Sequence, residues 1–278
     1  LFAQEKLETL KDKYFQEHNY SGFITYLKDL RKKSPLEVAQ VSFYIALSRY
    51  NQLRYLEESQ NWDEYFSSGN DYRDELVRQA SNTIKLTTSK DSINLYARTL
   101  LWQFHKEQQD VFAEEALKGL MNAVVEYSDK KKDPEPIKYI ADKLYNYGNK
   151  LESKKLYNIY VDKLLKVQTQ DEELKIAAQS AYNQGNVSLS TIIYDAYIDR
   201  IIKSYPKEKS STLLISIAKN FVYKDEGSSD PEYAEKIFTK IEEISEGKVL
   251  DEESSYIRAY NLEKLKSYPE AKDRYINL

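Results

Sequence analysis

Side chains that could carry out acid–base or nucleophilic chemistry are few in this chain. It contains two histidines, His18 and His105, and no cysteine. Histidine is the usual acid or base near neutral pH, and a cysteine thiolate is a common nucleophile and metal ligand. Both histidines fall near predicted helix ends, where surface or satisfied interface positions are expected. Adjacent carboxylates such as Glu57-Glu58 are typical of solvent-exposed helix faces. The sequence alone does not exclude general acid–base catalysis by a carboxylate pair. We expect a non-catalytic protein without a cofactor.

Sequence motifs and charge exclude further classes of function. The chain has no glycine-rich phosphate loop, no nucleophile elbow and no His-Glu-x-x-His helix. Its formal net charge is −4, from 41 basic and 45 acidic residues, so no global field would attract nucleic acid. The densest basic run, Lys130–Lys132, lies between aspartates and beside prolines and indicates a solvated linker. We therefore expect no nucleic-acid partner.

Membrane insertion is not expected either, because no stretch approaches the roughly 18 apolar residues of a spanning helix. The compartment stays open between two alternatives. If Leu1-Phe2-Ala3 are the last residues of an export signal, the protein lies in a bacterial periplasm or is secreted; otherwise it is cytoplasmic.

The elements that position these side chains are predicted to be helices throughout. Apolar residues recur at steps of three and four, as in Leu156, Ile159, Tyr160 and Leu164. All six prolines fall in predicted connections or first turns, where a missing N–H does no harm. No segment alternates with period two, so we expect an all-α protein with almost no strand.

An internal repeat defines how the helices are organised. Residues 141–166 align without a gap on residues 178–203 at a shift of 37, and Gly148-Asn149 falls on Gly185-Asn186. Glycine and asparagine tolerate the left-handed conformation of a tight helix–helix turn. Each copy is therefore a helical hairpin that must stack on neighbours to bury its apolar stripe. The predicted helices are 137–147 paired with 150–166, and 174–184 paired with 187–203.

The repeat resembles the tetratricopeptide family. That family places a small residue midway along helix A, an aromatic after the turn, and a small residue followed by an aromatic in helix B. The last unit matches with Ala259, Tyr268, Ala271 and Tyr275. The resemblance implies an α-solenoid of stacked antiparallel helix pairs, wound as a superhelix. It covers about four-fifths of the chain.

The resemblance also suggests the domain organisation. Residues 1–127 are expected to hold N-terminal repeats, followed by a linker at 128–136 and further repeats at 137–278, all in one continuous solenoid. The stretch 36–90 departs most from the pattern, so it carries either an insertion or longer helices. Helix B of the last unit has no cap after it, which predicts a longer natural chain or self-association through this face.

The resemblance implies a concave groove for an extended or helical peptide, lined by exposed helix A residues. Asparagine can bond a peptide backbone as donor and acceptor, and tyrosine offers rigid contact area. In the family's members that grip a terminal carboxylate, an asparagine occupies the position that is Asp142 or Gln179 here, so that ligand is not expected. The alternative is that Tyr145 and Tyr182 fill space beside their turns while their asparagine neighbours cap helices. The predicted groove residues are Lys138, Asp142, Tyr145 and Asn146, repeated as Lys175, Gln179, Tyr182 and Asn183.

These observations favour a non-catalytic scaffold that binds another protein or a peptide, in a bacterial envelope assembly if the chain is exported. An RNA-binding helical-repeat protein is the first alternative, which the near-neutral charge disfavours. An enzyme on a helical toroid is the second, and it would need long inward loops that carry acids.

Overall fold

The structure is a computed structural model that describes residues 2–278 apart from residues 31, 33, 168–170, 184, 224–228 and 246–250. The described residues form fourteen helices and no strand, which confirms the all-α prediction. None of these helices is both long enough and apolar enough to cross a membrane. In chain order they are α1 (Phe2–Gln16), α2 (Tyr20–Asp29), α3 (Pro35–Glu58), α4 (Trp62–Leu86), α5 (Ser92–Gln108), α6 (Ala113–Lys130), α7 (Glu135–Asn146), α8 (Lys150–Val167), α9 (Asp171–Asn183), α10 (Val187–Ser204), α11 (Lys207–Val222), α12 (Pro231–Ile244), α13 (Glu252–Lys264) and α14 (Tyr268–Ile276).

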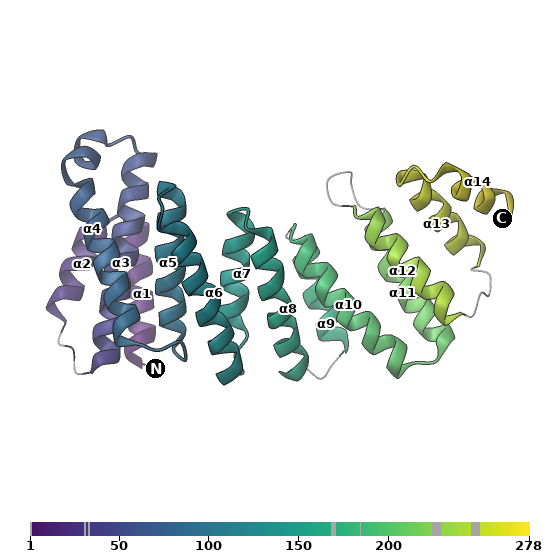
Figure 1. Cartoon of the computed structure of the whole chain (residues 1–278), viewed down its shortest axis with the longest axis horizontal. Coiled ribbons are helices and arrows are strands. Elements are labelled where there is room, and N and C mark those ends of the chain that lie inside the picture. The colour runs from purple at the N-terminus through teal and green to yellow at the C-terminus, as the bar shows by residue number, and fades with distance from the viewer. Residues whose placement is uncertain are drawn as a thin grey trace. The chain divides into compact units, whose positions relative to one another are not determined.

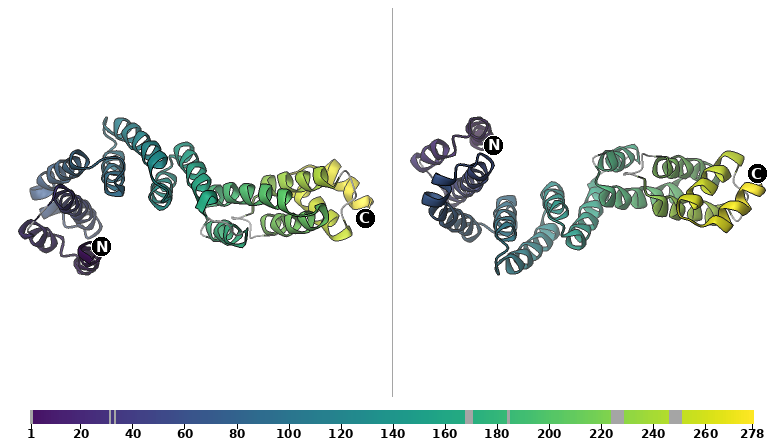
Figure 2. Two further views of the ribbon diagram at one scale, coloured as in Figure 1. Left: turned by 90° about the horizontal axis from the view of Figure 1, so that it is seen from below. Right: turned by 90° about the horizontal axis from the view of Figure 1, so that it is seen from above.

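The chain folds into two compact units, Leu1–Leu156 and Tyr157–Leu278, and the boundary falls inside α8. In the first unit, α3 packs on α4 and α5, and α5 packs on α6 and α7 (Figure 1). In the second unit the pairs are α9 with α10, α11 with α12, and α13 with α14, and α11 also packs on α13. Figure 2 shows the helices of residues 171–278 in two rows. Each unit therefore has solenoid-like packing, in which helices contact the helix that follows them in the chain and, as in α3 with α5 or α11 with α13, the second one after it.

The two copies of the repeat have matching helices and matching turns. The four helices begin and end within three residues of the predicted positions. Gly148 and Gly185 have φ of +80° and +79°, the left-handed region that glycine adopts without strain. In both turns the N–H of the following residue, Asn149 or Asn186, donates over 2.9 Å to the carbonyl oxygen five residues earlier. This is the bond that closes a Schellman-type helix end.

Small side chains mark where helices approach closely. The repeat-equivalent alanines Ala141 and Ala178 are fully buried, as are Ala218 and Ala259 in the later pairs. A larger side chain at these positions would push the paired helices apart.

Two equivalent buried serines differ in their hydrogen bonds. Ser153 donates from Oγ to the carbonyl oxygen of Ala141 over 2.8 Å, and Ser153 is 0% exposed. Ser190, also 0% exposed, has an Oγ without a hydrogen-bond partner among the described residues. The repeat therefore preserves the residue but not its bond.

The divergent stretch 36–90 forms long helices. The helices α3 and α4 have 24 and 25 residues, and Ser67–Asn70 lies inside α4. Gly69 is buried beside Leu53 of α3, where an added Cβ would lie 3.7 Å from the leucine Cδ2. Of the two alternatives, the one with longer helices is confirmed.

The predicted linker 128–136 contains a short connection, residues 131–134, between α6 and α7. It does not separate two bodies, because α7 packs on α5 and belongs to the first unit.

A network of partly buried side chains joins α3 and the last turns of α5 to Tyr147, the residue after α7. Gln103 donates from Nε2 to the hydroxyl of Tyr147 over 2.6 Å and also to that of Tyr50. Both tyrosine hydroxyls donate to the carboxylate of Glu107, that of Tyr50 over 2.6 Å. The ring of Tyr147 meets Trp102 edge to face, with 5.5 Å between ring centroids. These side chains thus tie α3 and α5 to the C-terminal end of α7.

Candidate functional site

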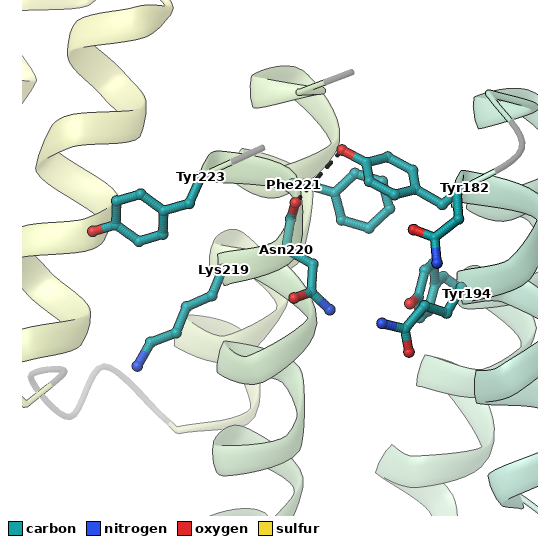
Figure 3. Close-up of a pocket in the computed structure, with 8 residues that line it drawn as sticks. Tyr182, Tyr194, Lys219, Asn220, Phe221 and Tyr223 are labelled. Carbon is teal, nitrogen blue, oxygen red and sulfur yellow. Dashed lines mark hydrogen bonds between the residues drawn. The ribbon is translucent and has the colours of Figure 1, made fainter. Parts of the chain in front are cut away.

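A pocket of about 290 Å³ opens in the second unit, beside the last turns of α9 and α11 (Figure 3). Its floor is aromatic and its rim carries amides. Its lining consists of Gln179, Tyr182, Asn183, Tyr194, Lys219, Asn220, Phe221 and Tyr223.

The floor is built by the tight turn after α9. Tyr182 lies in the last turn of that helix and is only 4% exposed, and its ring meets Phe221 edge to face, with 4.7 Å between centroids. Its hydroxyl donates over 3.5 Å to the backbone oxygen of Asn220, the dashed line in Figure 3. Tyr194 of α10 also meets Phe221 edge to face, with 5.5 Å between ring centroids. Edge-to-face ring pairs of this kind stabilise the floor by about 0.5–1.5 kcal/mol each.

Both floor tyrosines stay neutral at physiological pH. Burial raises the pKa of Tyr182 to about 12, and the nearby charge of Asp230 adds to this shift. Burial also raises the pKa of Tyr194, while a side-chain hydrogen bond with Asn220 partly opposes it. Low-dielectric surroundings disfavour a phenolate, so the floor presents neutral hydroxyl groups.

The rim offers donors and acceptors with little net charge. Gln179, Asn183 and Asn220 are exposed, and each amide can both donate and accept. Lys219, the one cation in the lining among the described residues, pairs over 2.6 Å with Glu253 of α13.

The aromatic surface continues from the pocket onto α13. Tyr223 is 53% exposed and stacks on Tyr260, with 5.8 Å between centroids and 17° between ring planes. The ammonium of Lys264 lies 5.0 Å from the centroid of Tyr260. Tyr256, one turn earlier on α13, is 51% exposed. Half-exposed rings in a row suit contact with another chain.

The α9 half of the predicted groove divides into two parts. Gln179, Tyr182 and Asn183 come together in the pocket. Lys175 is absent from its lining and lies 3.8 Å from the carboxylate of Glu172. The near-complete burial of Tyr182 agrees with the space-filling alternative for its ring, whereas Asn183 is exposed.

The α7 half lies in the first unit. Lys138 pairs with Asp142 over 2.9 Å, the ring of Tyr145 is half-buried with the ammonium of Lys150 at 5.9 Å, and Asn146 is exposed. A groove that joins both halves stays a prediction.

The residues that α11 contributes to the pocket were not predicted from the sequence. Aligning Ala178 with Ala218 would have placed Gln179 opposite Lys219 and Asn183 opposite Tyr223. The helix α11 has 16 residues, whereas α9 has 13. The 37-residue spacing of the repeat therefore does not continue to Ala218, so a comparison at that spacing does not find this match.

The two histidines have local partners. His18 stacks on Tyr55 with 4.2 Å between centroids, and its Nδ1 lies 3.3 Å from the hydroxyl of Tyr20. His105 Nδ1 lies 2.7 Å from a carboxylate oxygen of Asp110. Within the described residues, no group of three or more His, Cys, Asp or Glu could hold a metal ion.

The fold and the pocket define an all-α protein of stacked helices with an amide-rimmed, aromatic-floored pocket on one unit. No protein-family model matches the chain, and no curated protein sequence is significantly similar to it.

Proposed function

We propose that this chain is a tetratricopeptide-like, non-catalytic scaffold that binds an extended peptide segment of another protein. The observation that carries the proposal is the pocket beside α9 and α11, where Gln179, Asn183 and Asn220 surround an aromatic floor. Exposed amides on two neighbouring helices match the donors and acceptors of a peptide backbone.

The size of the pocket favours a peptide over a cofactor. A volume of about 290 Å³ lies at the low end of small-molecule sites, which span roughly 300–1,000 Å³. It suits one side chain of a longer ligand. The ligand's flanking residues would lie against the exposed rings of Tyr223 and Tyr256, which extend the surface onto α13.

The charge of the site supports hydrogen bonding and aromatic contact as the main sources of affinity. Lys219 already pairs with Glu253, so little positive charge is left for phosphates. We therefore expect peptide affinity to depend weakly on salt, whereas RNA affinity would fall steeply as salt rises.

The experiment starts by selecting peptides from a displayed random library on the whole chain. One selected peptide is then measured against the double variant Asn183→Ala, Asn220→Ala. Each lost hydrogen bond costs about 0.5–1.5 kcal/mol, so the affinity should fall about tenfold or more. Asn158→Ala, on the exposed surface of α8, is the matched control and should bind as the parent does.

Thermal unfolding separates a binding role from a structural one. Exposed substitutions usually change stability by less than about 0.5 kcal/mol, so Asn183→Ala alone should melt as the parent does, while Asn220→Ala also loses its bond with Tyr194 and should cost about 0.5–1.5 kcal/mol. If the stability of the double variant falls by more than this and affinity is lost only as the fold is lost, the asparagines are helix-end caps and the proposal fails.

A further inference from the structure

A second concave surface lies in the first unit, between α4 and α6 with α5 beneath them. It consists of two cavities of about 480 and 490 Å³. Both are lined by Ile84 of α4, Arg98 of α5 and Gly119 of α6, so the cavities adjoin and form one groove. We call it the Arg98 groove.

The α5 residues of the Arg98 groove follow one stripe of the helix. Asn94, Arg98, Leu101 and His105 are separated by four, three and four positions, which places them on one face. From the first to the last, the stripe runs about 16 Å at 1.5 Å per residue. An extended peptide of about five residues has the same length. The groove is therefore long enough for a short peptide segment.

Arg98 lies half-buried at the middle of this groove. Its Nε donates to Oδ1 of Asn94 over 2.8 Å. Among the described residues, no carboxylate oxygen lies within 4.0 Å of its guanidinium. Burial lowers the pKa of Arg98, and the more distant charge of Glu126 opposes this only in part. A partly desolvated cation without a counter-ion is costly and is stabilised by an anionic group from a ligand.

Gly119 keeps the approach to this guanidinium open. A Cβ at that position would lie 3.3 Å from Nη1 of Arg98, a close contact. Glycine inside a helix lowers stability, so its presence in α6 needs a local reason. Here the missing side chain leaves room for a ligand group beside Arg98.

The two ends of the Arg98 groove differ in polarity. Towards the start of α5, hydroxyl and amide groups of Thr88, Ser89 and Asn122 line it. Towards the end of α5, Val77, Leu101 and the 56% exposed Phe112 form an apolar wall.

The acidic groups in the lining leave Arg98 available. Glu126 is engaged by Lys130 over 2.7 Å, and Glu115 is exposed near the apolar end. Asp110, which does not line the groove, contacts His105.

We propose that the Arg98 groove binds an acidic peptide segment of a partner protein, with a peptide carboxylate on Arg98 and a neighbouring apolar side chain against Leu101 and Phe112. The guanidinium fork matches a carboxylate bidentately, and the apolar wall takes the adjacent side chain. This site is independent of the pocket beside α9 and α11.

The test uses two fluorescein-labelled pentapeptides, Leu-Glu-Leu-Glu-Leu and its amide analogue Leu-Gln-Leu-Gln-Leu, titrated with the whole chain by fluorescence polarisation. We expect the glutamate peptide to bind at least tenfold more tightly than the glutamine peptide. The Arg98→Gln variant should reduce this ratio to below about twofold, and Arg98→Lys should retain part of it. Arg78→Gln is the matched control, because Arg78 is 71% exposed on α4 and lies outside the groove lining.

A second variant keeps the test independent of charge. Gly119→Leu fills the space beside Arg98 and should weaken the glutamate peptide at least tenfold while the guanidinium remains. No measurable binding of the glutamate peptide to the parent would overturn the proposal. Equal affinity for both peptides, or a preference that survives Arg98→Gln, would do the same. The pocket variants Asn183→Ala and Asn220→Ala should leave the preference unchanged, so the two proposals can fail separately.

Discussion

Ser153 and Ser190 offer an internal comparison in which the same mutation should have opposite effects. Both are 0% exposed and occupy equivalent positions in the 37-residue repeat. Ser153 donates over 2.8 Å to the carbonyl oxygen of Ala141, whereas the hydroxyl of Ser190 has no partner in the described part of the chain. Ser153→Ala loses a hydrogen bond and should lower the free energy of unfolding by about 0.5–1.5 kcal/mol.

Ser190→Ala removes a buried hydroxyl whose desolvation is not compensated. Such a group costs about 1–3 kcal/mol, and the alanine methyl keeps most of the packing. We expect the free energy of unfolding to rise by about 1 kcal/mol, at the low end of that range. The two variants should therefore differ by about 2 kcal/mol, with opposite signs relative to the parent.

Urea unfolding followed by far-UV circular dichroism measures this difference, because the midpoint shifts while the slope stays constant. Ser216→Ala, at an exposed position of α11, is the control and should change stability by less than about 0.5 kcal/mol. Equal destabilisation by both mutations would refute the reasoning, since it would mean that both hydroxyls have partners.

Three further predictions concern the packing, the turns and the floor of the pocket. Ala178→Leu should lower the free energy of unfolding by about 1–3 kcal/mol in urea denaturation, because it overpacks a fully buried contact; an unchanged midpoint would contradict the assigned register. Gly148→Ala and Gly185→Ala should each cost about 1–2 kcal/mol through backbone strain alone, since φ is near +80° and an added Cβ meets nothing within 4 Å. A smaller loss would mean that the turn relaxes. The pKa of Tyr182 is raised from 10.0 to about 12, so its contribution to stability is complete below pH 10.0 and is lost as pH rises towards about 12. Tyr182→Phe should remove the part of the alkaline loss of stability that the Tyr182 hydroxyl causes, measured as the free energy of unfolding across that pH range. If the variant and the parent have the same pH profile, the loss does not come from Tyr182.

Local rules made the helix pairs predictable. The glycine–asparagine turn, the central alanine and the apolar spacing all act within one hairpin. The ends of the four helices in residues 137–203 could therefore be predicted to within three residues. The same reasoning placed Tyr182 and Asn183 in the last turn of the helix before the glycine turn, and α9 ends at Asn183.

Features that depend on several helices at once could not be predicted. The pocket needs α11, and the greater length of α11 moves Ala218 away from the 37-residue spacing. The Arg98 groove needs α4 and α6 to flank α5 with a gap between them. Nothing in the local pattern around Arg98 or Gly119 indicates that gap, because its width is set by the packing of long helices.

The hydroxyl network around Glu107 has a consequence for limited proteolysis. Residues 131–134 form an exposed, lysine-containing connection that trypsin should cut readily. A cut there breaks the backbone between α6 and α7, yet the contacts of Tyr147 with Gln103, Glu107 and Trp102 lie elsewhere and remain in place. The nicked protein should therefore give two bands on a denaturing gel but elute as a single species at its original size under native conditions.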